Sequence, residues 1–288
     1  MTETILYRSK RVLEYDDFSR LINMNNRFSW LTDNYEGLYE LWSHCDNDDE
    51  KKLIEFLIDN FRYTTASDLN NSGNSIANQI ENIWKLESHN TYIVATCDDR
   101  KPDGSQAFIQ SIKNKFSITW ENNNFYNNLL EAAHKLEDNI EIVLVDDFIG
   151  TGDTIKKKST YLIKKLNERN INNFKIRVVA FAAMEFAKEK IDRLNLEFYS
   201  YIWLKKGISE LITEQAKRKK AILIMSGLED KLGENYKNLK LSRLRFGYKQ
   251  SESLFSLESF NIPNNVFPIF WWPKLNDNKY CKTLFHRL

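Results

Sequence analysis

The sequence predicts an open α/β sheet of mainly parallel strands, covered by helices on both faces and preceded by a helical N-terminal region. Two observations lead to this fold class. Apolar runs of strand length at residues 140–145, 177–182 and 198–204 alternate with segments of helical spacing. These runs are unbroken, as in parallel strands buried on both faces, whereas the first ninety residues carry only helical spacing.

Helical spacing recurs three times in the N-terminal region. Segments 35–45, 48–61 and 75–86 each place apolar side chains three and four residues apart, so that these side chains share one face. Segment 48–61 begins with acidic residues, which suit the positive end of a helix dipole. The polar run 68–74, between the second and third of these helices, is expected to be a loop.

The pattern changes at residue 91. We expect a strand at 92–96, the polar stretch CDDRKPDGS, a helix at 106–116, a loop at 119–128 and a helix at 129–136. Helices at 154–167, at 185–194 and within 210–227 separate the later strands, and 253–257 could supply a further strand. The chain therefore divides into a helical region at 1–90, an α/β domain at 91–260 and a C-terminal segment at 261–288.

Charge and cysteine content exclude several classes of protein. Lys and Arg number 41 against 40 Asp and Glu, so no overall field gathers nucleic acid or an anionic membrane. Cys45, Cys97 and Cys281 are far apart, which argues against a disulfide framework or a structural zinc site. The first residues lack the apolar core of a signal peptide and no stretch approaches a membrane helix, so we expect a soluble, cytoplasmic protein.

The string IVLVDDFIGTGDTI, residues 142–155, is the motif that carries chemistry. Asp146 and Asp147 follow an apolar strand, and a turn of small residues then opens a helix. Ligands bind at the carboxyl ends of strands in open α/β sheets, and a helix N-terminus favours a phosphate. The residues expected to bind that phosphate are Phe148, Ile149, Gly150, Thr151, Gly152, Asp153 and Thr154. A ribose 5-phosphate fits this arrangement, with its hydroxyls on the two acids.

Other phosphate motifs match this string less well. No GK[ST] follows the turn, so it is not a Walker A loop, and a Walker B strand would need a Walker A elsewhere. The third glycine of GxGxxG is absent. A plain strand, turn and helix with an acidic end remains the alternative interpretation.

The string resembles the phosphoribosyl pyrophosphate (PRPP) signature of type I phosphoribosyltransferases, which combines an apolar strand, two adjacent acids and a small-residue turn before a helix. The resemblance implies the type I fold, PRPP or a related ribose 5-phosphate compound as ligand, and transfer of phosphoribose. It implies that Asp146 and Asp147 are catalytic and hold the ribose hydroxyls directly or through Mg²⁺, the expected cofactor. Asp153 stands where many members carry a small residue, which puts a negative charge near the phosphate unless its side chain caps the helix.

The same resemblance suggests two further loops. Type I members bind pyrophosphate after an earlier strand, and the equivalent residues here would be Arg100, Lys101 and Gly104. An ordinary solvated loop would look the same. Segment 119–128 is positioned for the mobile loop that closes over the reacting centre in the family, but its sequence is not diagnostic.

The C-terminal stretch NIPNNVFPIFWWP, residues 261–273, resembles a second group. These are phosphoribosyltransferase-like proteins of bacterial conflict systems, including retron antiphage modules. The resemblance implies an antiviral effector whose partners would be a defence protein, a reverse transcriptase or a non-coding RNA. Asn264 and Asn265 would then form a hood that reads a base or hydroxyl, unless they simply occupy a turn. The acceptor, a homo-oligomeric state and an inactive ligand-sensing or interaction role stay open.

Overall fold

The computed structural model describes residues 13–97 and 104–287. Contacts divide the chain into two compact units. Unit 1 combines Met1–Tyr63 with Lys206–Leu288, and Unit 2 is Thr64–Lys205. These units cut the chain differently from the three consecutive segments of the sequence analysis, because both ends of the chain contribute to Unit 1.

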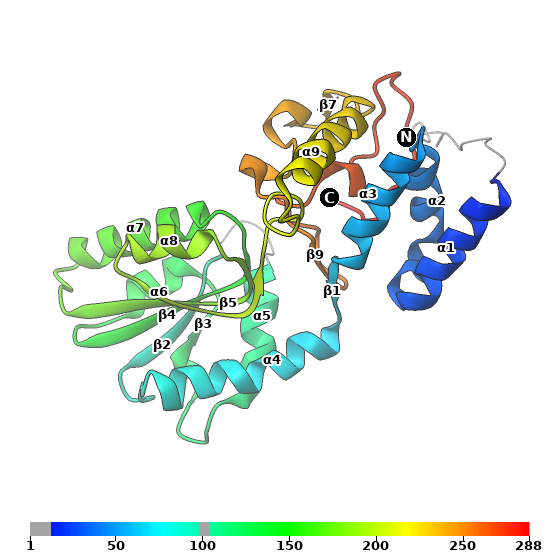
Figure 1. The fold of residues 1–288 in the computed structure, drawn as a ribbon. Helices are drawn as coiled ribbons and strands as arrows, with labels where there is room; N and C mark the ends of the chain where they lie inside the picture. Colours follow the sequence, from blue (N-terminus) through cyan, green and yellow to red (C-terminus); the bar gives the residue numbers. More distant parts are fainter. Residues whose placement is uncertain (1–12, 98–103, 288) are drawn as a thin grey trace, which may run out of the picture. The chain divides into compact units, whose positions relative to one another are not determined.

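Unit 2 is built on a five-stranded sheet within the described residues, in the order β3-β2-β4-β5-β6 (Figure 1). Its strands are β2 (Thr91–Ala95), β3 (Phe125–Tyr126), β4 (Ile140–Ile149), β5 (Phe174–Met184) and β6 (Glu197–Leu204). All four neighbouring pairs are parallel. The central strands are almost wholly buried, which explains why their sequences read as unbroken apolar runs.

Helices cover both faces of this sheet. They are α4 (Ala66–Asn78), α5 (Gly104–Ile112), α6 (Leu129–Lys135), α7 (Asp153–Glu168) and α8 (Ala187–Asp192). Ile142 and Leu144 of β4 share one core with apolar residues of α6, α7 and α8, whereas Phe108 of α5 packs on Phe181 of β5, with ring centroids 6.2 Å apart. Figure 1 shows α7 and α8 on one face of the sheet and α4 on the other. The predicted fold class, an open parallel α/β sheet after helical N-terminal elements, is confirmed.

The strand order reverses beside β2. From β2 the chain moves outward to β3 and then returns to the other side of β2 to form β4. The connections that follow β2 and β4 therefore leave the sheet in opposite directions. A crevice outside the carboxyl ends of two such strands is where open α/β sheets bind ligands.

Two of the local predictions are wrong. The sequence predicts a loop at residues 68–74, but these residues lie inside α4, which continues into a π-helical turn at Gln79–Ile83. A capping box starts α4: Thr65 Oγ1 accepts from Asp68 N, and the Asp68 carboxylate accepts from Thr65 N. The expected loop at 119–128 contains the short edge strand β3. The Asn124 amide supports this strand by donating to the carbonyls of Ser88 and Thr91.

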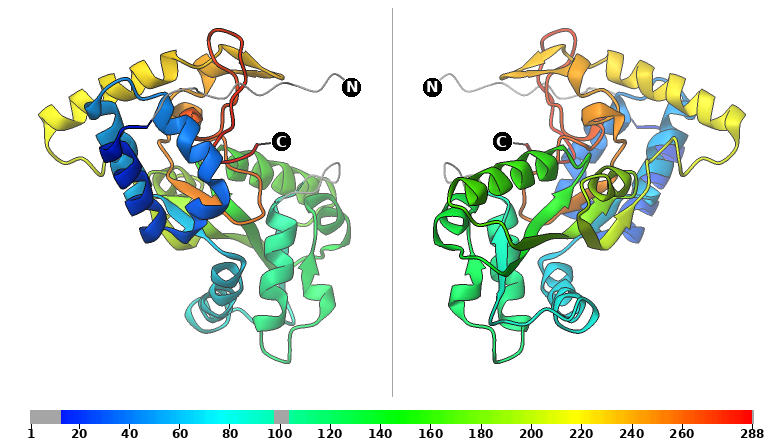
Figure 2. Two further views of the ribbon diagram at one scale, coloured as in Figure 1. Left: turned by 90° about the vertical axis from the view of Figure 1, so that its right-hand side faces the viewer. Right: turned by 90° about the vertical axis from the view of Figure 1, so that its left-hand side faces the viewer.

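Unit 1 is mainly helical around its own core. Its helices are α1 (Tyr15–Arg27), α2 (Tyr35–Ser43), α3 (Asp48–Asp59) and α9 (Gln215–Asp230), and its short strands are β7 (Asn235–Tyr236), β8 (Leu239–Lys240) and β9 (Phe255–Leu257). Figure 2 shows α9, in yellow, beside the blue helices. The 253–257 strand is present as β9, but it pairs with β1 (Arg62–Thr64) as a separate two-stranded sheet.

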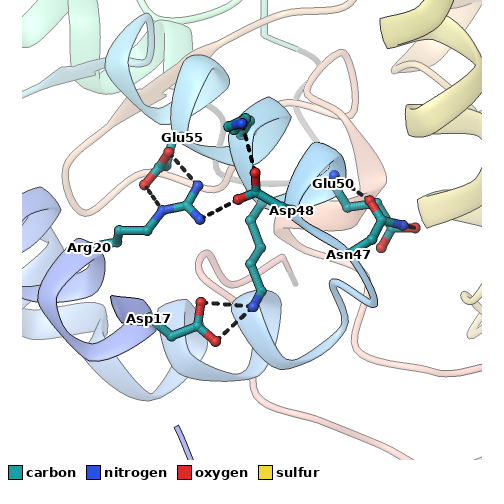
Figure 3. Close-up of polar contacts among 8 residues, drawn as sticks. Asp17, Arg20, Asn47, Asp48, Glu50 and Glu55 are labelled. Carbon is teal, nitrogen blue, oxygen red and sulfur yellow. Dashed lines mark hydrogen bonds and ion pairs between the residues drawn. The ribbon is translucent and has the colours of Figure 1, made fainter. Parts of the chain in front are cut away.

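Charged side chains hold α1 against α3. Arg20 donates to both carboxylate oxygens of Glu55, at 2.7 and 2.8 Å, and to Asp48 at 2.7 Å (Figure 3). Lys51 of α3 donates to the Asp17 carboxylate of α1. The Arg20 guanidinium also lies 4.9 Å from the ring of the buried Trp42. These pairs orient α1, although each partly exposed pair contributes little to stability.

In residues 13–97 and 104–287, no helix combines the length and apolar character that a bilayer crossing requires.

Candidate functional site

The two acids lie where β4 extends beyond the end of its neighbour β2. The last pair between these strands is Ala95 with Val145, whereas β4 stays paired with β5 as far as Ile149 and Ala183. The predicted end of the strand at residue 145 is therefore wrong, because β5 continues to support β4 for four more residues. Asp146 and Asp147 directly follow Val145, the last residue of β4 that pairs with β2, and so lie where the strand order of the sheet reverses.

Asp147 lies on the face of the sheet that α5 covers. Leu144 and Ile149, five residues apart, both belong to the core that contains α7, so regular alternation stops in this part of β4. The backbone of Gly104, the first residue of α5, lies directly against the Asp147 carboxylate, so that a Cβ at position 104 would overlap it. The start of α5 and the acid of β4 thus meet at one point.

A glycine turn follows the strand and opens α7. Gly152 is the N-cap residue and has φ +74°, a left-handed conformation that glycine adopts without steric cost. The N-cap has no side chain to accept from the first helical amides, and Gly150, Thr151 and Gly152 are themselves buried. The amides at the start of this 16-residue helix are suited to an anion. Ile149, only 2% exposed, belongs to the apolar core.

Asp153 is neutralised by a residue that the sequence analysis missed. Its carboxylate accepts from Thr151 Oγ1 at 2.9 Å and from Lys190 Nζ at 2.8 Å. Lys190 belongs to α8, 37 residues further along the chain. Asp153 therefore does not present an uncompensated charge to the turn, which removes the main objection that the sequence raised. No local signal could identify Lys190, because the pairing depends on the packing of α8 beside the turn.

The remaining predicted site residues fall into three groups. Phe148 is half-buried and Thr154 is exposed at the start of α7. Arg100 and Lys101 lie outside the described residues. Asn264 and Asn265 belong to Unit 1, where the buried Asn265 amide donates to Ser251 Oγ at 3.0 Å and the Asn264 carbonyl accepts from Tyr248 N. The Asn265 side chain therefore serves the packing of Unit 1.

The two carboxylates at the reversal of strand order suit a hard cation that is also bound by a ligand's phosphates. Carboxylate oxygens are the ligands that Mg²⁺ prefers, and Mg²⁺ commonly takes one or two of them together with substrate phosphates. Within the two described ranges, no group of three or more His, Cys, Asp or Glu side chains is placed to hold a metal alone. Asp146 and Asp147 fit a cation that arrives with a phosphorylated ligand.

Open parallel sheets bind ligands at such a switch point, and a glycine turn that opens a helix is a favourable place for a phosphate. Comparison with known families is more specific. The chain belongs to the PRTase-CE family, whose model matches residues 40–287. The prediction of a phosphoribosyltransferase-like protein is thus confirmed. None of the curated proteins matches the chain.

Solved structures give partial likenesses at low sequence identity. Orotate phosphoribosyltransferase from Aeropyrum pernix is 13% identical with a TM-score of 0.32, over 46% of this chain and 69% of that one. A hypothetical protein from Neisseria gonorrhoeae with bound ppGpp is 11% identical with a TM-score of 0.36, over 58% and 98%. A hypoxanthine-guanine-xanthine phosphoribosyltransferase is 14% identical with a TM-score of 0.33, over 51% and 81%.

Proposed function

We propose that Unit 2 binds PRPP, or a related ribose 5-phosphate compound, at the carboxyl ends of β2 and β4, where the strand order reverses. The 5-phosphate occupies the turn from Phe148 to Thr154, where α7 begins. Asp146 and Asp147 accept hydrogen bonds from the ribose hydroxyls. Membership of the PRTase-CE family supports this assignment, and so does the meeting of two strand ends, two acids and a helix start with a glycine N-cap at one point.

The reaction that this site supports is transfer of phosphoribose. The bond between C1 of the ribose and the pyrophosphate oxygen breaks, the acceptor forms a new bond to C1, and the acceptor's proton is released. Positive charge develops on the sugar ring, so the nearby carboxylates of Asp146 and Asp147 stabilise the transition state by position and charge. Asp146 and Asp147 would hold Mg²⁺ together with the ligand, and the ion would neutralise negative charge on the leaving group.

The single observation that carries the proposal is the construction of the turn. Gly152 adopts φ +74°, which only a residue without Cβ adopts freely, and it is the N-cap of a long helix, where it has no side chain to accept from the first amides. Thr151 Oγ1 makes only a long contact, 3.4 Å, with the first of these amides, Asp153 N. Lys190 neutralises the only carboxylate within the turn itself, Asp153. A phosphate is the ligand group that such a turn favours.

Calorimetric titration of the full chain with PRPP and Mg²⁺ tests the proposal. We expect saturable binding of one PRPP per chain, and at least a 100-fold loss of affinity in the Asp146→Asn/Asp147→Asn variant, which loses two charge-assisted contacts of about 1.5–3 kcal/mol each. The control is Glu189→Gln/Asp192→Asn, which removes two exposed charges from α8 in the same unit. Equal PRPP affinity in the folded acid variant and the control would refute the site.

We further propose that the chain is an effector in a bacterial antiphage system, acting by phosphoribose transfer or by attack on nucleotides. The resemblance of residues 261–273 to conflict-system proteins supports this role. An alternative is a sensor that binds the phosphoribosyl ligand without turnover. Release of pyrophosphate from PRPP in the presence of nucleobases, nucleotides or RNA distinguishes them: pyrophosphate release that needs Asp146 and Asp147 supports the enzyme, and tight binding without release supports the sensor.

A further inference from the structure

Unit 1 contains a cavity that the phosphoribosyl site does not use. Its volume is about 670 Å³, within the range of pockets that hold small organic ligands. It is lined by Asn34, by Tyr236 and Lys237, and by residues between 271 and 287. Every lining residue belongs to Unit 1. The lining residues used below are Tyr236, Lys237, Trp271, Tyr280, Lys282 and Arg287.

Three of the lining side chains are aromatic. The Tyr236 and Tyr280 rings meet edge to face with centroids 6.3 Å apart, which fixes both rings, and Trp271 is 1% exposed with its Nε1 donating to the Val266 carbonyl. The half-buried Tyr236 and Tyr280 rings offer rigid apolar surfaces at low cost in side-chain entropy, whereas the Trp271 ring belongs to the core. A planar heteroaromatic group is the natural partner for such surfaces.

The charged lining side chains are all basic. Lys237, Lys282 and Arg287 line the cavity, together with His286, and no Asp or Glu does so. Lys282 is partly compensated by Glu36, whose carboxylate lies 3.5 Å from its Nζ. The Lys237 ammonium lies 5.2 Å from the Tyr236 ring and forms no ion pair with a carboxylate within residues 13–97 and 104–287. The cavity is therefore suited to an anion.

Arg287 is a largely buried cation in the lining of the cavity. Its guanidinium is largely buried, which lowers its pKa, and it lies 5.3 Å from the Trp271 ring. It donates to the Ile262 carbonyl, and in the part of the chain that the structure describes it forms no ion pair. A guanidinium has five N–H donors and stays charged, so burying one without a carboxylate is unfavourable unless an anion completes it.

Lys237 adds an independent observation from the backbone. Tyr236 pairs with Leu239, so that Lys237 is the first residue of the two-residue turn that joins β7 to β8. Its φ is +50°, a left-handed conformation that Asn and Gly adopt far more readily than Lys. A lysine in this position costs stability, and such strain is typical of a residue kept for its side chain.

We propose that this cavity binds a nucleotide, with the base against Tyr236 and Tyr280 and the phosphates on Lys237 and Arg287. The assignment combines planar apolar surfaces, a volume suited to a single small ligand, and two cations that form no ion pair within residues 13–97 and 104–287. It is separate from the phosphoribosyl site, because all its residues lie in Unit 1. The chain would then bind a nucleotide in one unit and a phosphoribosyl compound in the other.

Calorimetric titration with ATP, in the Asp146→Asn/Asp147→Asn background to silence the phosphoribosyl site, tests this proposal. We expect saturable binding of one ATP per chain, with adenosine and inorganic pyrophosphate each at least tenfold weaker, because each supplies only half of the contacts. Arg287→Gln should weaken ATP binding at least tenfold. Lys237→Asn should weaken ATP binding several-fold while leaving thermal stability equal or higher, because Asn suits the turn. If Lys237 were purely structural, the substitution would lower thermal stability and leave ATP binding unchanged.

The matched control is Lys279→Gln, which removes a cation of the same segment that is paired with Asp277 and does not line the cavity. It should leave ATP binding unchanged. The proposal is overturned if ATP does not saturate at millimolar concentration, if the control weakens binding as much as Lys237→Asn, or if single-stranded RNA binds more tightly than ATP.

Discussion

The two units place their carboxylates in opposite situations. In Unit 1, Glu229 and Glu252 are 0% and 4% exposed, and backbone amides satisfy them: Phe246 N donates to Glu229, and Ile208 N and Ser209 N donate to Glu252. In Unit 2, Asp146 and Asp147 lie beyond the last residue of β4 that pairs with β2, close to the start of α7, whose N-cap residue is a glycine. Burial does not separate the two kinds, because Asp146 is itself only 8% exposed.

The surrounding backbone separates them instead. The acids of Unit 1 bind backbone amides and so hold loops against helices. They also anchor residues with left-handed backbone, because Phe246 has φ +57° and Glu252 has φ +49°. The acids of Unit 2 stand at a switch point where two connections diverge and a phosphate-type turn follows. We therefore expect changes at the first pair to alter stability without altering PRPP binding, and changes at the second site to do the reverse.

The largest expected effect is at Glu252. Its carboxylate accepts from Ile208 N at 2.8 Å, from Ser209 N at 2.7 Å and from the Ser209 hydroxyl. Replacing it with Ala leaves two buried amides without an acceptor, at about 1–3 kcal/mol each, so we expect a loss of about 3 kcal/mol or more. Urea unfolding measures this loss. PRPP affinity in the fraction that stays folded should not change, and a selective loss of PRPP binding would break the comparison.

Glu229 should give Unit 1 a pH-dependent stability. Burial raises the pKa of its carboxyl from 4.5 to about 7 in the folded protein. The folded state therefore keeps this proton to higher pH than the unfolded chain, and the free energy of unfolding falls as pH rises from 4.5 to 7, by about 3 kcal/mol at most. Denaturant unfolding across that window measures the slope.

The Glu229→Gln variant should remove this contribution, because the amide oxygen can still accept from Phe246 N but no longer ionises. Its stability relative to the parent should therefore rise with pH through the same window. A difference between parent and variant that stays constant from pH 4.5 to 7 would show that the Glu229 carboxyl does not titrate there.

Two glycine substitutions should act with opposite signs. Gly152→Ala puts a Cβ on a residue with φ +74°, which costs about 1–2 kcal/mol and displaces the turn. Gly227 lies exposed inside α9 with no atom within 4 Å of a Cβ, so Gly227→Ala should stabilise by about 0.5–1 kcal/mol. Thermal unfolding compares the two variants. Only Gly152→Ala should also weaken PRPP binding, and an equal loss in both would contradict the assigned turn.

The smallest expected effect is at Lys190. Its ammonium lies 2.8 Å from the Asp153 carboxylate, so Lys190→Met leaves a negative charge beside the proposed phosphate. We expect PRPP affinity to fall several-fold and stability to change by less than about 1 kcal/mol, as for exposed ion pairs. Arg193→Met is the matched control, because Arg193 forms an exposed pair with Glu189 within the same segment. A fall in affinity at high salt as large as at low salt would argue against a charge effect.

Local sequence patterns predict elements of both units, including α2 and α3 of Unit 1, but they do not predict how Unit 1 is assembled. The central strands of Unit 2 are continuous in sequence and buried on both faces, so their composition alone identifies them. Unit 1 is assembled from both ends of the chain: Trp42 of α2 and Trp271 belong to one core, although more than 200 residues separate them. Periodicity contains no information about such pairing.

The candidate site shows the same division. The acids and the glycine turn are adjacent in sequence and were predicted together, as was Gly104. The contact between Gly104 and the Asp147 carboxylate, and the pairing of Lys190 with Asp153, depend on how α5 and α8 pack against the sheet. The missed start of α4 was readable, since Thr65 and Asp68 have the spacing of a capping box.

Amide hydrogen exchange with and without PRPP and Mg²⁺ tests the central claim most directly. The assigned site predicts that PRPP slows exchange at the amides from Phe148 to Ile155, because the phosphate accepts from them, and leaves α9 in Unit 1 unchanged. The Asp146→Asn/Asp147→Asn variant should lose this protection at the same PRPP concentration. Saturable binding of PRPP with protection confined to other segments would contradict the assignment.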